Sequence, residues 1–553
     1  MGNGRSKRSN ALALPIDNVF KLPSPLPSWP SGNGFGIGII DLGGGLQVRQ
    51  ISSFNKLWAT HQGGPSNNGT TFFEPTGVPE GFSVLGHYSQ PNNRSLHGWV
   101  LVGKAEAPVE GGGPLDKPLD YSLVWSSESL KMKQDGIAYV WAPTPPDGYK
   151  AVGFLVTTSP TKPSLDDIRC VRSDLTDECQ ADTWIWGPGE KSDANGLNFF
   201  SLRPIIRGTQ AMGVSVGSFG VTTSSASTSQ LACLKNVNSN FHYMPILPQV
   251  HALFQTYSPW VYFHPEEKYL PSSVTWFFTN GALLYRQGDE SNPVPIDPTG
   301  SNLPQGGSND GAYWLDLPAA QPDKDRVKKG DLEHTVVYLH VKPMLGGTFT
   351  DLVTWVFYPF NGPARAKVEF ANVSLGKIGQ HVGDWEHITL RISNFSGELW
   401  SVYFSEHRGG NWVRSSELEF LNGNKPVTYS SLHGHAMYSK PGLVLQGNGG
   451  IGIRNDAAKS LMVIDTGSRF LIIAAEYLGD EIVEQPPWVN YFRKWGPKID
   501  YDINKEIRKI EKFFPGKLKS AFAKFVKALP NEVLGEEGPT GPKLKPSWTG
   551  DEV

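Results

Sequence analysis

The chain of 553 residues carries 50 Lys and Arg against 53 Asp and Glu, a formal net charge of −3. This balance excludes a protein held on nucleic acid by its overall charge, and the length exceeds what one hydrophobic core usually organises. With 61 Gly, 43 Pro and 17 Trp beside only 7 Met, the composition indicates many turns between short aromatic strands. We therefore predict a mainly β fold in two modules, with peripheral and C-terminal helices.

Residues 1–34 are predicted to form a flexible arm that begins with a pattern typical of N-myristoylation at Gly2. One acyl chain binds a membrane only marginally, so nearby positive charge would act as the second signal, from Arg5, Lys7 and Arg8. The alternative is a disordered tail that matches a short pattern by chance. The chain has only three Cys, no apolar run long enough to span a bilayer and no signal-peptide core. These features favour a cytoplasmic protein that is peripheral to an endomembrane or the plasma membrane.

Residues 35–217 are predicted to form a duplicated β-domain, with repeats at about 54–120 and 121–215. Trp58 in the first repeat is matched by Trp125 in the second. In each copy a Pro-Glu-Gly or Pro-Asp-Gly turn delivers an aromatic residue into the next strand, so the motif is first of all a folding device.

The second copy also resembles the adaptor-binding repeats of vacuolar-protein-sorting-thirteen-type bridge lipid-transfer proteins. The resemblance is carried by Pro145-Pro146-Asp147-Gly148-Tyr149, with segments 121–125 before it and 170–175 after it. In that family the repeats are β modules that grasp peptide motifs on organelle adaptors, so the resemblance implies an adaptor-binding face. A structural duplication without a binding face is the alternative.

Residues 218–240 form a Ser/Thr-rich linker by composition, and the domain boundary is predicted there. A β-sandwich-like domain follows over 241–498. Ten of the 13 histidines lie after residue 240, so any metal or acid-base chemistry is expected in this domain. A basic helical segment over 499–530 and a disordered tail over 531–553 complete the predicted organisation.

The stretch from His381 to Ile392 predicts the functional site. Strict alternation places Asp384 and Glu386 on the same strand face as Ile388, Leu390 and Ile392. Two neighbouring carboxylates that point toward an apolar core repel each other and lose hydration. They therefore need a cation, a shared proton or an arginine.

A turn at Asn394-Phe395-Ser396-Gly397 would fold the next strand back along this one. Oxygen and imidazole donors would then converge on a divalent cation, Mg or Ca rather than Zn, from His381, Asp384, Glu386 and His407. A further set could join them, namely His433, His435 and His387. The alternative is a buried charge network without metal, in which Arg408 or Arg391 is the counter-ion.

Two family resemblances involve this region. Gly383-Asp384-Trp385-Glu386-His387, with segments 358–363 and 433–436, resembles the plant family of vacuolar protein sorting protein sixty-two-like proteins over nearly the whole chain. More remotely, the spacing of His381, Asp384-Trp385-Glu386 and His407 is similar to motifs of necrosis-and-ethylene-inducing cytolysins. Those β-sandwich proteins hold a divalent cation while they engage sphingolipid headgroups, which implies that His381, Asp384 and Glu386 are ligands here.

Near the C-terminus, apolar residues at 518, 521, 522, 525, 526 and 529 form one helical stripe opposed by lysines. A basic amphipathic helix of this kind can lie in a membrane interface. The predicted membrane contacts are Lys517, Lys519, Lys524 and Lys527. The alternative, which the β-rich context favours, is that the stripe docks on a β-domain and leaves the lysines free to meet anionic lipid.

Together these features predict a peripheral membrane-associated protein of vacuolar or endomembrane trafficking that binds a lipid headgroup or an adaptor peptide and holds a divalent cation. No nucleic-acid partner and no transmembrane span are expected. One alternative is a metal-dependent hydrolase with Asp384 or Glu386 as general base. Because no nucleophile elbow, P-loop or HExxH motif occurs, a non-enzymatic role is favoured. The other alternative is a membrane-acting, cytolysin-like defence protein.

Overall fold

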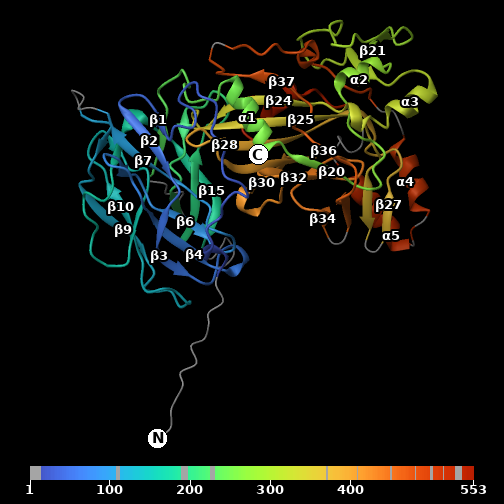
Figure 1. The fold of residues 1–553 in the computed structure, drawn as a ribbon. Coiled ribbons are helices and arrows are strands. Elements are labelled where there is room, and N and C mark those ends of the chain that lie inside the picture. Colours follow the sequence, from blue (N-terminus) through green and yellow to red (C-terminus); the bar gives the residue numbers. More distant parts are fainter. Residues whose placement is uncertain are drawn as a thin grey trace.

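The structure, a computed structural model, describes residues 14–106, 112–187, 197–223, 231–368, 371–407, 409–448, 451–479, 481–498, 502–512, 514, 516–527, 529 and 538–552. Over these residues the fold is mainly β, as predicted. Two β modules lie side by side, the first built from β1 to β19 and the second from β20 to β37 (Figure 1). The predicted lipidation and membrane-contact residues of the arm lie outside the described residues, namely Gly2, Arg5, Lys7 and Arg8.

The first module contains three antiparallel units of one topology, one more than the duplication predicted from the sequence. In each unit the first strand pairs with the second through a β-bulge, and the second pairs with the third. The units are β3 (Phe54–Thr60), β4 (Thr70–Pro75) and β6 (Tyr88–Pro91); β9 (Asp120–Ser126), β10 (Tyr139–Thr144) and β12 (Leu155–Thr157); and β15 (Cys179–Trp186), β16 (Leu197–Pro204) and β18 (Phe219–Thr223). The first two units are the predicted repeats, with Trp58 in β3 and Trp125 in β9.

Part of the predicted linker over 218–240 is strand. Residues 219–223 form β18, which completes the third unit. Residues 233–235 form β19 (Cys233–Lys235), which lies between β14 (Thr176–Asp177) and β17 (Gly213–Val214). The Ser/Thr cluster that suggested a linker falls at 224–230, outside the described residues.

Aromatic rings from the three units meet in one core. The ring of Trp125 lies 5.8 Å from that of Trp58 and 5.9 Å from that of Trp186, and both contacts are edge-to-face. The remaining strands enclose a second, aliphatic core. They are β1 (Ile39–Asp41), β2 (Leu46–Ile51), β5 (Ser83–Val84), β7 (Val100–Ala105), β8 (Leu115–Asp116), β11 (Tyr149–Lys150) and β13 (Cys170–Arg172).

Residues 14–34, predicted as part of a flexible arm, pack on both modules. Ile16 is buried in the first module. Trp29 packs against the core of the second module, and its indole Nε1 donates a hydrogen bond to the carbonyl of Ser396 at 2.8 Å. The hydrophobic surface of these side chains explains why the segment is held in place.

The second module is built on a six-stranded sheet in the order β30-β29-β28-β25-β24-β37. Its strands are β24 (Val337–Met344), β25 (Phe349–Asn361), β28 (His381–Ser393), β29 (Leu399–Glu406), β30 (Gly409–Arg414) and β37 (Phe470–Ala475). One face packs on α1 (Leu247–Tyr257) and on a second sheet through a large apolar core. The second sheet contains β20 (Trp260–Phe263), β31 (Phe420–Leu421), β32 (Lys425–Ser430), β33 (Met437–Tyr438) and β36 (Val463–Asp465).

The opposite face of the six-stranded sheet is covered by an aromatic layer that includes Trp355, Trp385 and Trp495. This layer also contains residues of α2 (Val274–Thr279), β21 (Leu283–Arg286) and β23 (Tyr313–Asp316). Nearby lie β22 (Val294–Pro295) and α3 (Gln321–Val327). The sheet is therefore buried on both faces.

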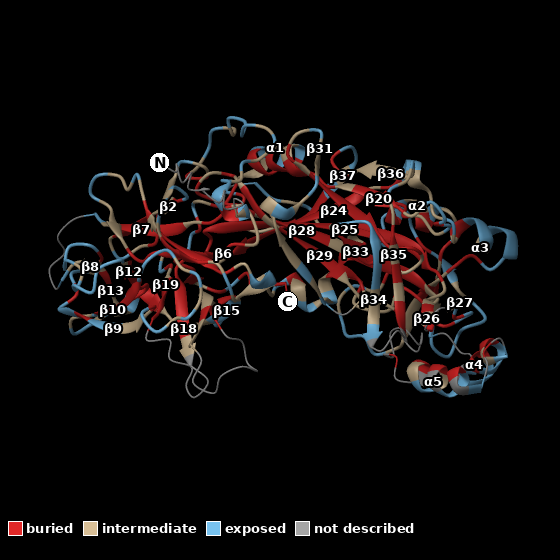
Figure 2. Cartoon of the chain, turned by 90° about the horizontal axis from the view of Figure 1, so that it is seen from below, coloured by how far each residue is buried: buried red, intermediate tan, exposed pale blue. Residues whose placement is uncertain are grey.

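The predicted amphipathic helix docks on the second module. Leu518, Phe522 and Val526 of α5 (Gly516–Lys527) are buried with α4 (Ile503–Glu511) against a four-stranded sheet (Figure 2). That sheet contains β26 (Arg365–Val368), β27 (Ala371–Ser374), β34 (Gly442–Asn448) and β35 (Ile451–Ala457). Lys519 and Lys524 remain exposed. The side chains of Lys517 and Lys527 lie outside what the structure describes.

Residues 538–552, predicted as part of a disordered tail, pack on the second module, and their end reaches the first module through Thr549 and Asp551. The C-terminus lies close to β28 (Figure 1). The ring of Trp548 stacks on that of His340 at 3.9 Å. The carboxylate of Asp551 accepts hydrogen bonds from Arg207 of the first module at 2.6 Å and from Arg391 of the second at 2.5 Å. These contacts with distant parts of the chain outweigh the Gly/Pro-rich composition on which the prediction of disorder rested.

Glu398, between β28 and β29, gives a pH-dependent prediction. Burial raises the pKa of its carboxyl to about 7. Because the folded pKa lies above the unfolded one, stability falls as the pH rises through this interval. The substitution Glu398→Gln is expected to raise the free energy of unfolding by about 1–2 kcal/mol at about pH 8 and to leave it unchanged at about pH 4. Urea denaturation at the two pH values measures the difference, and an equal gain at both would contradict the assignment.

Candidate functional site

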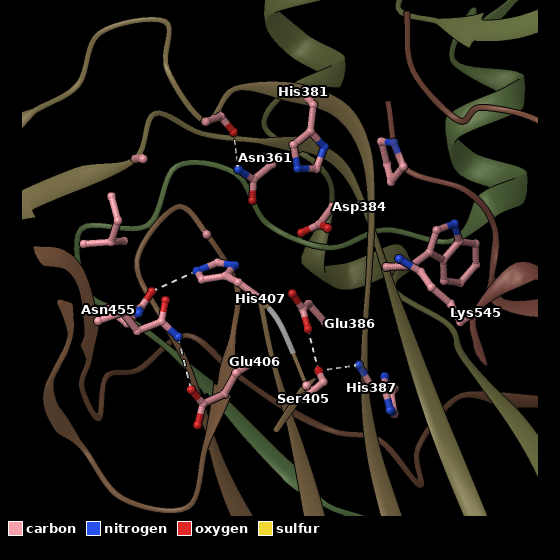
Figure 3. A pocket seen from close by; sticks show the side chains of 18 of the residues that line it. Asn361, His381, Asp384, Glu386, His387, Ser405, Glu406, His407, Asn455 and Lys545 are labelled. Atoms are coloured by element: carbon pink, nitrogen blue, oxygen red, sulfur yellow. Dashed lines mark hydrogen bonds between the residues drawn. The ribbon is translucent and has the colours of Figure 1, made fainter. Parts of the chain in front are cut away.

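A cavity of 880 Å³ opens where β28 loses its neighbour on one side. β28 pairs with β25 along nearly all of its length but with β29 only from Ile388 onward, so the edge at residues 381–387 faces the cavity. The hairpin of β34 and β35 and the segment 538–552 supply other walls. Side chains from both faces of β28 therefore reach one space (Figure 3).

Gly383 sets the orientation of the acidic pair. Its φ of +66° is a left-handed conformation that favours glycine, and a Cβ there would lie 2.7 Å from the carbonyl oxygen of Trp495. From this residue onward the strand alternates regularly. Ile388 and Leu390 enter one core and Trp385 the other. Asp384 and Glu386 lie on the face of the isoleucines and are 8% and 7% exposed.

His435 neutralises Asp384. Its Nε2 is 2.9 Å from the carbonyl oxygen of Tyr269, which can only accept, so Nε2 carries a proton. Its Nδ1 is 2.9 Å from Oδ2 of Asp384. Burial alone would raise the pKa of Asp384, but the hydrogen bond with His435 holds this pKa below its usual value. Asp384 is therefore ionised, and His435 is an imidazolium.

Glu386 is neutralised by a proton instead. Burial, reinforced by repulsion from Asp384, raises its pKa well above the usual value. The hydroxyl of Ser405 donates a hydrogen bond to Glu386 and accepts one from the backbone N–H of His387 at 3.0 Å. One carboxylate of the pair is thus balanced by an internal cation and the other by protonation.

His381 lines the cavity, and its Nε2 has no hydrogen-bond partner among the described residues. Its Nδ1 donates to the carbonyl of Gly383 at 2.7 Å, so Nε2 is the acceptor nitrogen of the neutral ring. Burial lowers the pKa of His381 and favours this neutral form. A backbone carbonyl that fixes the tautomer is also how metal-binding histidines are oriented.

The other predicted histidines do not join this group. Each has its own partner: His407 with Asn455 at 2.9 Å, His433 with Glu267 at 3.2 Å and His387 with Glu552 at 3.2 Å. His407 lies on the facing wall of the cavity (Figure 3), so the predicted convergence of all four donors is not observed. Across the described ranges, no three or more His, Cys, Asp or Glu side chains are placed to hold a metal ion.

Arg391 is not the counter-ion of the acidic pair. It lies on the opposite face of β28 and binds Asp351 and Asp551. Arg408 lies outside the described residues. Sequence reasoning gave His435 only a secondary place, placed Ser405 beside the acidic pair without a role, and missed Asn455 and Lys545. Asn455 and Lys545 lie on distant segments that no local pattern connects to β28.

The fold and the cavity define a mainly β protein of two modules with a pocket at an open strand edge. Residues 16–552 match the model of the family described as Vacuolar protein sorting-associated protein 62, so the chain belongs to that family. Vacuolar protein sorting-associated protein 62 of Saccharomyces cerevisiae (strain ATCC 204508 / S288c) is 24% identical over 216 residues, which cover 34% of this chain and 44% of the yeast protein. The match thus spans less than half of that relative.

Similarities to solved structures are weak. GNIP1Aa from Chromobacterium piscinae has a TM-score of 0.28 at 19% identity, over 34% of this chain and 37% of that one. A structure described as "Toxin fold as basis for microbial attack and plant defense" has a TM-score of 0.22 at 12% identity, over 49% and 97%. NLPPya in complex with mannosamine has a TM-score of 0.19 at 14% identity, over 34% and 66%. These scores are too low to assign a chemistry to the cavity.

Proposed function

We propose that this chain is a peripheral membrane protein of vacuolar or endomembrane sorting, which binds a lipid headgroup in the cavity together with a divalent cation. The observation that carries the proposal is the acidic pair at an open strand edge, where His381 also lines the cavity. To hold Mg or Ca, the side chains of Asp384, Glu386 and His381 would have to draw together from their present positions, and Glu386 would have to give up its proton. Membership of a vacuolar protein sorting family supports the setting.

Membrane contact would come from outside the cavity. Lys519 and Lys524 on α5 are exposed while the apolar stripe of the helix is buried, so the helix offers charge to anionic lipid rather than an inserted face. None of the helices within the described ranges is long and apolar enough to cross a bilayer. Gly2, with Arg5, Lys7 and Arg8, would add a lipid anchor, and an adaptor peptide bound to the first module would add partner contact.

Vesicle flotation tests the proposal. We expect unlipidated protein to float with phosphatidylcholine/phosphatidylserine vesicles, and to do so more in calcium than in EDTA. The double substitution Asp384→Asn/Glu386→Gln should remove only the calcium-dependent part. Lys519→Gln/Lys524→Gln should weaken the salt-sensitive part by about 1 kcal/mol per lysine.

The substitution Asp323→Asn on exposed α3 serves as the control and should change neither part. Flotation that is the same in calcium and in EDTA for the unmodified chain would remove the cation from the proposal. Binding that does not depend on phosphatidylserine would remove the basic helix α5 from the proposed membrane contact. With myristoylated protein, equal flotation of the Gly2→Ala variant would remove lipidation.

A further inference from the structure

Cys179 and Cys233 lie on neighbouring segments of the first module. Cys179 is the first residue of β15, and Cys233 is the first residue of β19. In the antiparallel pair of β14 and β19, Asp177 is the partner of Cys233, and Cys179 follows Asp177 by two residues. Because side chains two residues apart along an extended segment point to the same side, this register places both thiols on one face.

The contacts of the two thiols agree with this register. The Cys179 thiol donates a hydrogen bond at 2.9 Å to the carbonyl of Leu231, which precedes Cys233 by two residues. Leu231 is buried in the aromatic core of the three units, against which Cys179 also packs. The two thiols interact directly, and this hydrogen bond, together with burial, raises the pKa of Cys233 well above its usual value. A small adjustment of the side chains would bring the sulfurs to bonding distance, about 2 Å.

The two thiols differ in their access to solvent. Cys179 is partly exposed, whereas Cys233 is 1% exposed. A dissolved disulfide therefore meets the sulfur of Cys179 and not that of Cys233. Cys233 also keeps its proton while Cys179 is unmodified, because the contact with Cys179 is the largest cause of its raised pKa. Cys179 is thus the first sulfur to react, and Cys233 is placed to react second.

Cys170, the third cysteine of the chain, has a different environment. It belongs to β13, in a separate sheet, where its partner on β8 is Asp116. Its side chain is fully buried, and burial raises the pKa of the thiol to about 12. A thiol that is both buried and protonated is inert toward disulfides, so Cys170 is an internal control for the other two.

We propose that Cys179 and Cys233 form a reversible disulfide by exchange with a small disulfide of the glutathione type. The Cys179 thiol loses its proton to solvent, and the thiolate attacks one sulfur of glutathione disulfide, whose S–S bond breaks as one glutathione leaves. The Cys233 thiol then loses its proton and attacks Sγ of Cys179, which releases the second glutathione. Two protein thiols are oxidised to one disulfide, and one glutathione disulfide is reduced to two glutathione thiols. Because a dithiol reverses the bond, a reducing compartment is compatible with it.

The disulfide would close a loop that contains the whole third unit. β15, β16 and β18 all lie between Cys179 and Cys233 in the chain. A cross-link over a loop of this kind restricts the unfolded chain and so stabilises the folded unit. Shortly after Cys233, the amide of Asn236 donates a hydrogen bond at 2.6 Å to the carbonyl of Gly346 in the second module. Oxidation would therefore strengthen the first module beside its contact with the second.

Alkylation under denaturing conditions, followed by intact mass measurement and peptide mapping, counts the thiols of the full chain. We expect the reduced chain to take up three alkyl groups, and the chain treated with glutathione disulfide to take up only one, on Cys170. No glutathione should stay attached, and dithiothreitol should restore every thiol. A lasting glutathione adduct on Cys179, a cross-link that includes Cys170, or three thiols after the treatment would each overturn the inference.

Three variants separate the roles of the sulfurs. Cys233→Ala should stop at a glutathione adduct on Cys179, and Cys179→Ser should leave both remaining thiols unmodified. The control Cys170→Ala should form the disulfide as the unmodified chain does. Oxidation should raise the urea midpoint of the unmodified chain and of Cys170→Ala, and should not change that of Cys179→Ser. An equal rise in Cys179→Ser would contradict the assignment, because that variant cannot form the bond.

Discussion

Replacing Arg391 with Met is expected to lower the free energy of unfolding by about 3–5 kcal/mol. The guanidinium binds both oxygens of Asp351, at 2.9 and 2.8 Å, and also Asp551 at 2.5 Å. It lies 4.1 Å from the ring centroid of Trp412. Asp351 is fully buried, and burial raises its pKa despite Arg391. Without the arginine, this carboxyl would stay in the sheet with no cation in contact.

Urea denaturation followed by tryptophan fluorescence measures the loss. The matched control is Arg172→Met, which breaks an exposed arginine–aspartate pair with Asp174 at 2.7 Å and should cost less than about 1 kcal/mol. A loss for Arg391→Met no larger than that of the control would mean that the buried network adds no net stability.

The substitution His435→Leu is expected to destabilise the chain by about 3 kcal/mol or more. It removes the imidazolium that neutralises Asp384 and leaves the carboxylate 8% exposed with no bonded partner of opposite charge. The ring of His435 also stacks on Tyr358 at 3.8 Å, and leucine restores only part of that packing.

The double substitution His435→Leu/Asp384→Leu separates charge from packing. Because it leaves no charge uncompensated, we expect it to recover most of the stability that the single change loses. Thermal or urea unfolding of the three proteins gives the coupling between the two residues. If the double variant is no more stable than His435→Leu, packing accounts for the loss and the imidazolium assignment is wrong.

The sequence predicted the orientation of the acidic pair because strand alternation is a local property. Asp384, Glu386 and Ile388 follow one another on β28, and their shared face needs no knowledge of the rest of the chain. His435 could not be given its place in this way. It follows β32, which pairs in parallel with β20, and its φ of +58° belongs to an irregular turn. Such contacts depend on tertiary packing, which periodicity does not encode.

The difference between local patterns and tertiary contacts also explains why the structure departs from the predicted domain boundaries. The third unit of the first module repeats the topology of the others, but Trp186 follows Trp125 by 61 residues whereas Trp125 follows Trp58 by 67, so the period that revealed the duplication does not continue. The prediction of disorder over 531–553 rested on the high content of Gly and Pro in that segment. Trp548 and Asp551, within that range, are held by His340, Arg207 and Arg391, which are remote in sequence.

The double engagement of Asp551 bears on how the molecule can move. Swinging one module away from the other would tear this carboxylate from either Arg207 or Arg391. It would also withdraw Phe395, which the second module inserts into the aliphatic core of the first. The loss of these two contacts opposes a hinge motion between the modules. The first module and the mouth of the cavity are therefore kept at a fixed separation.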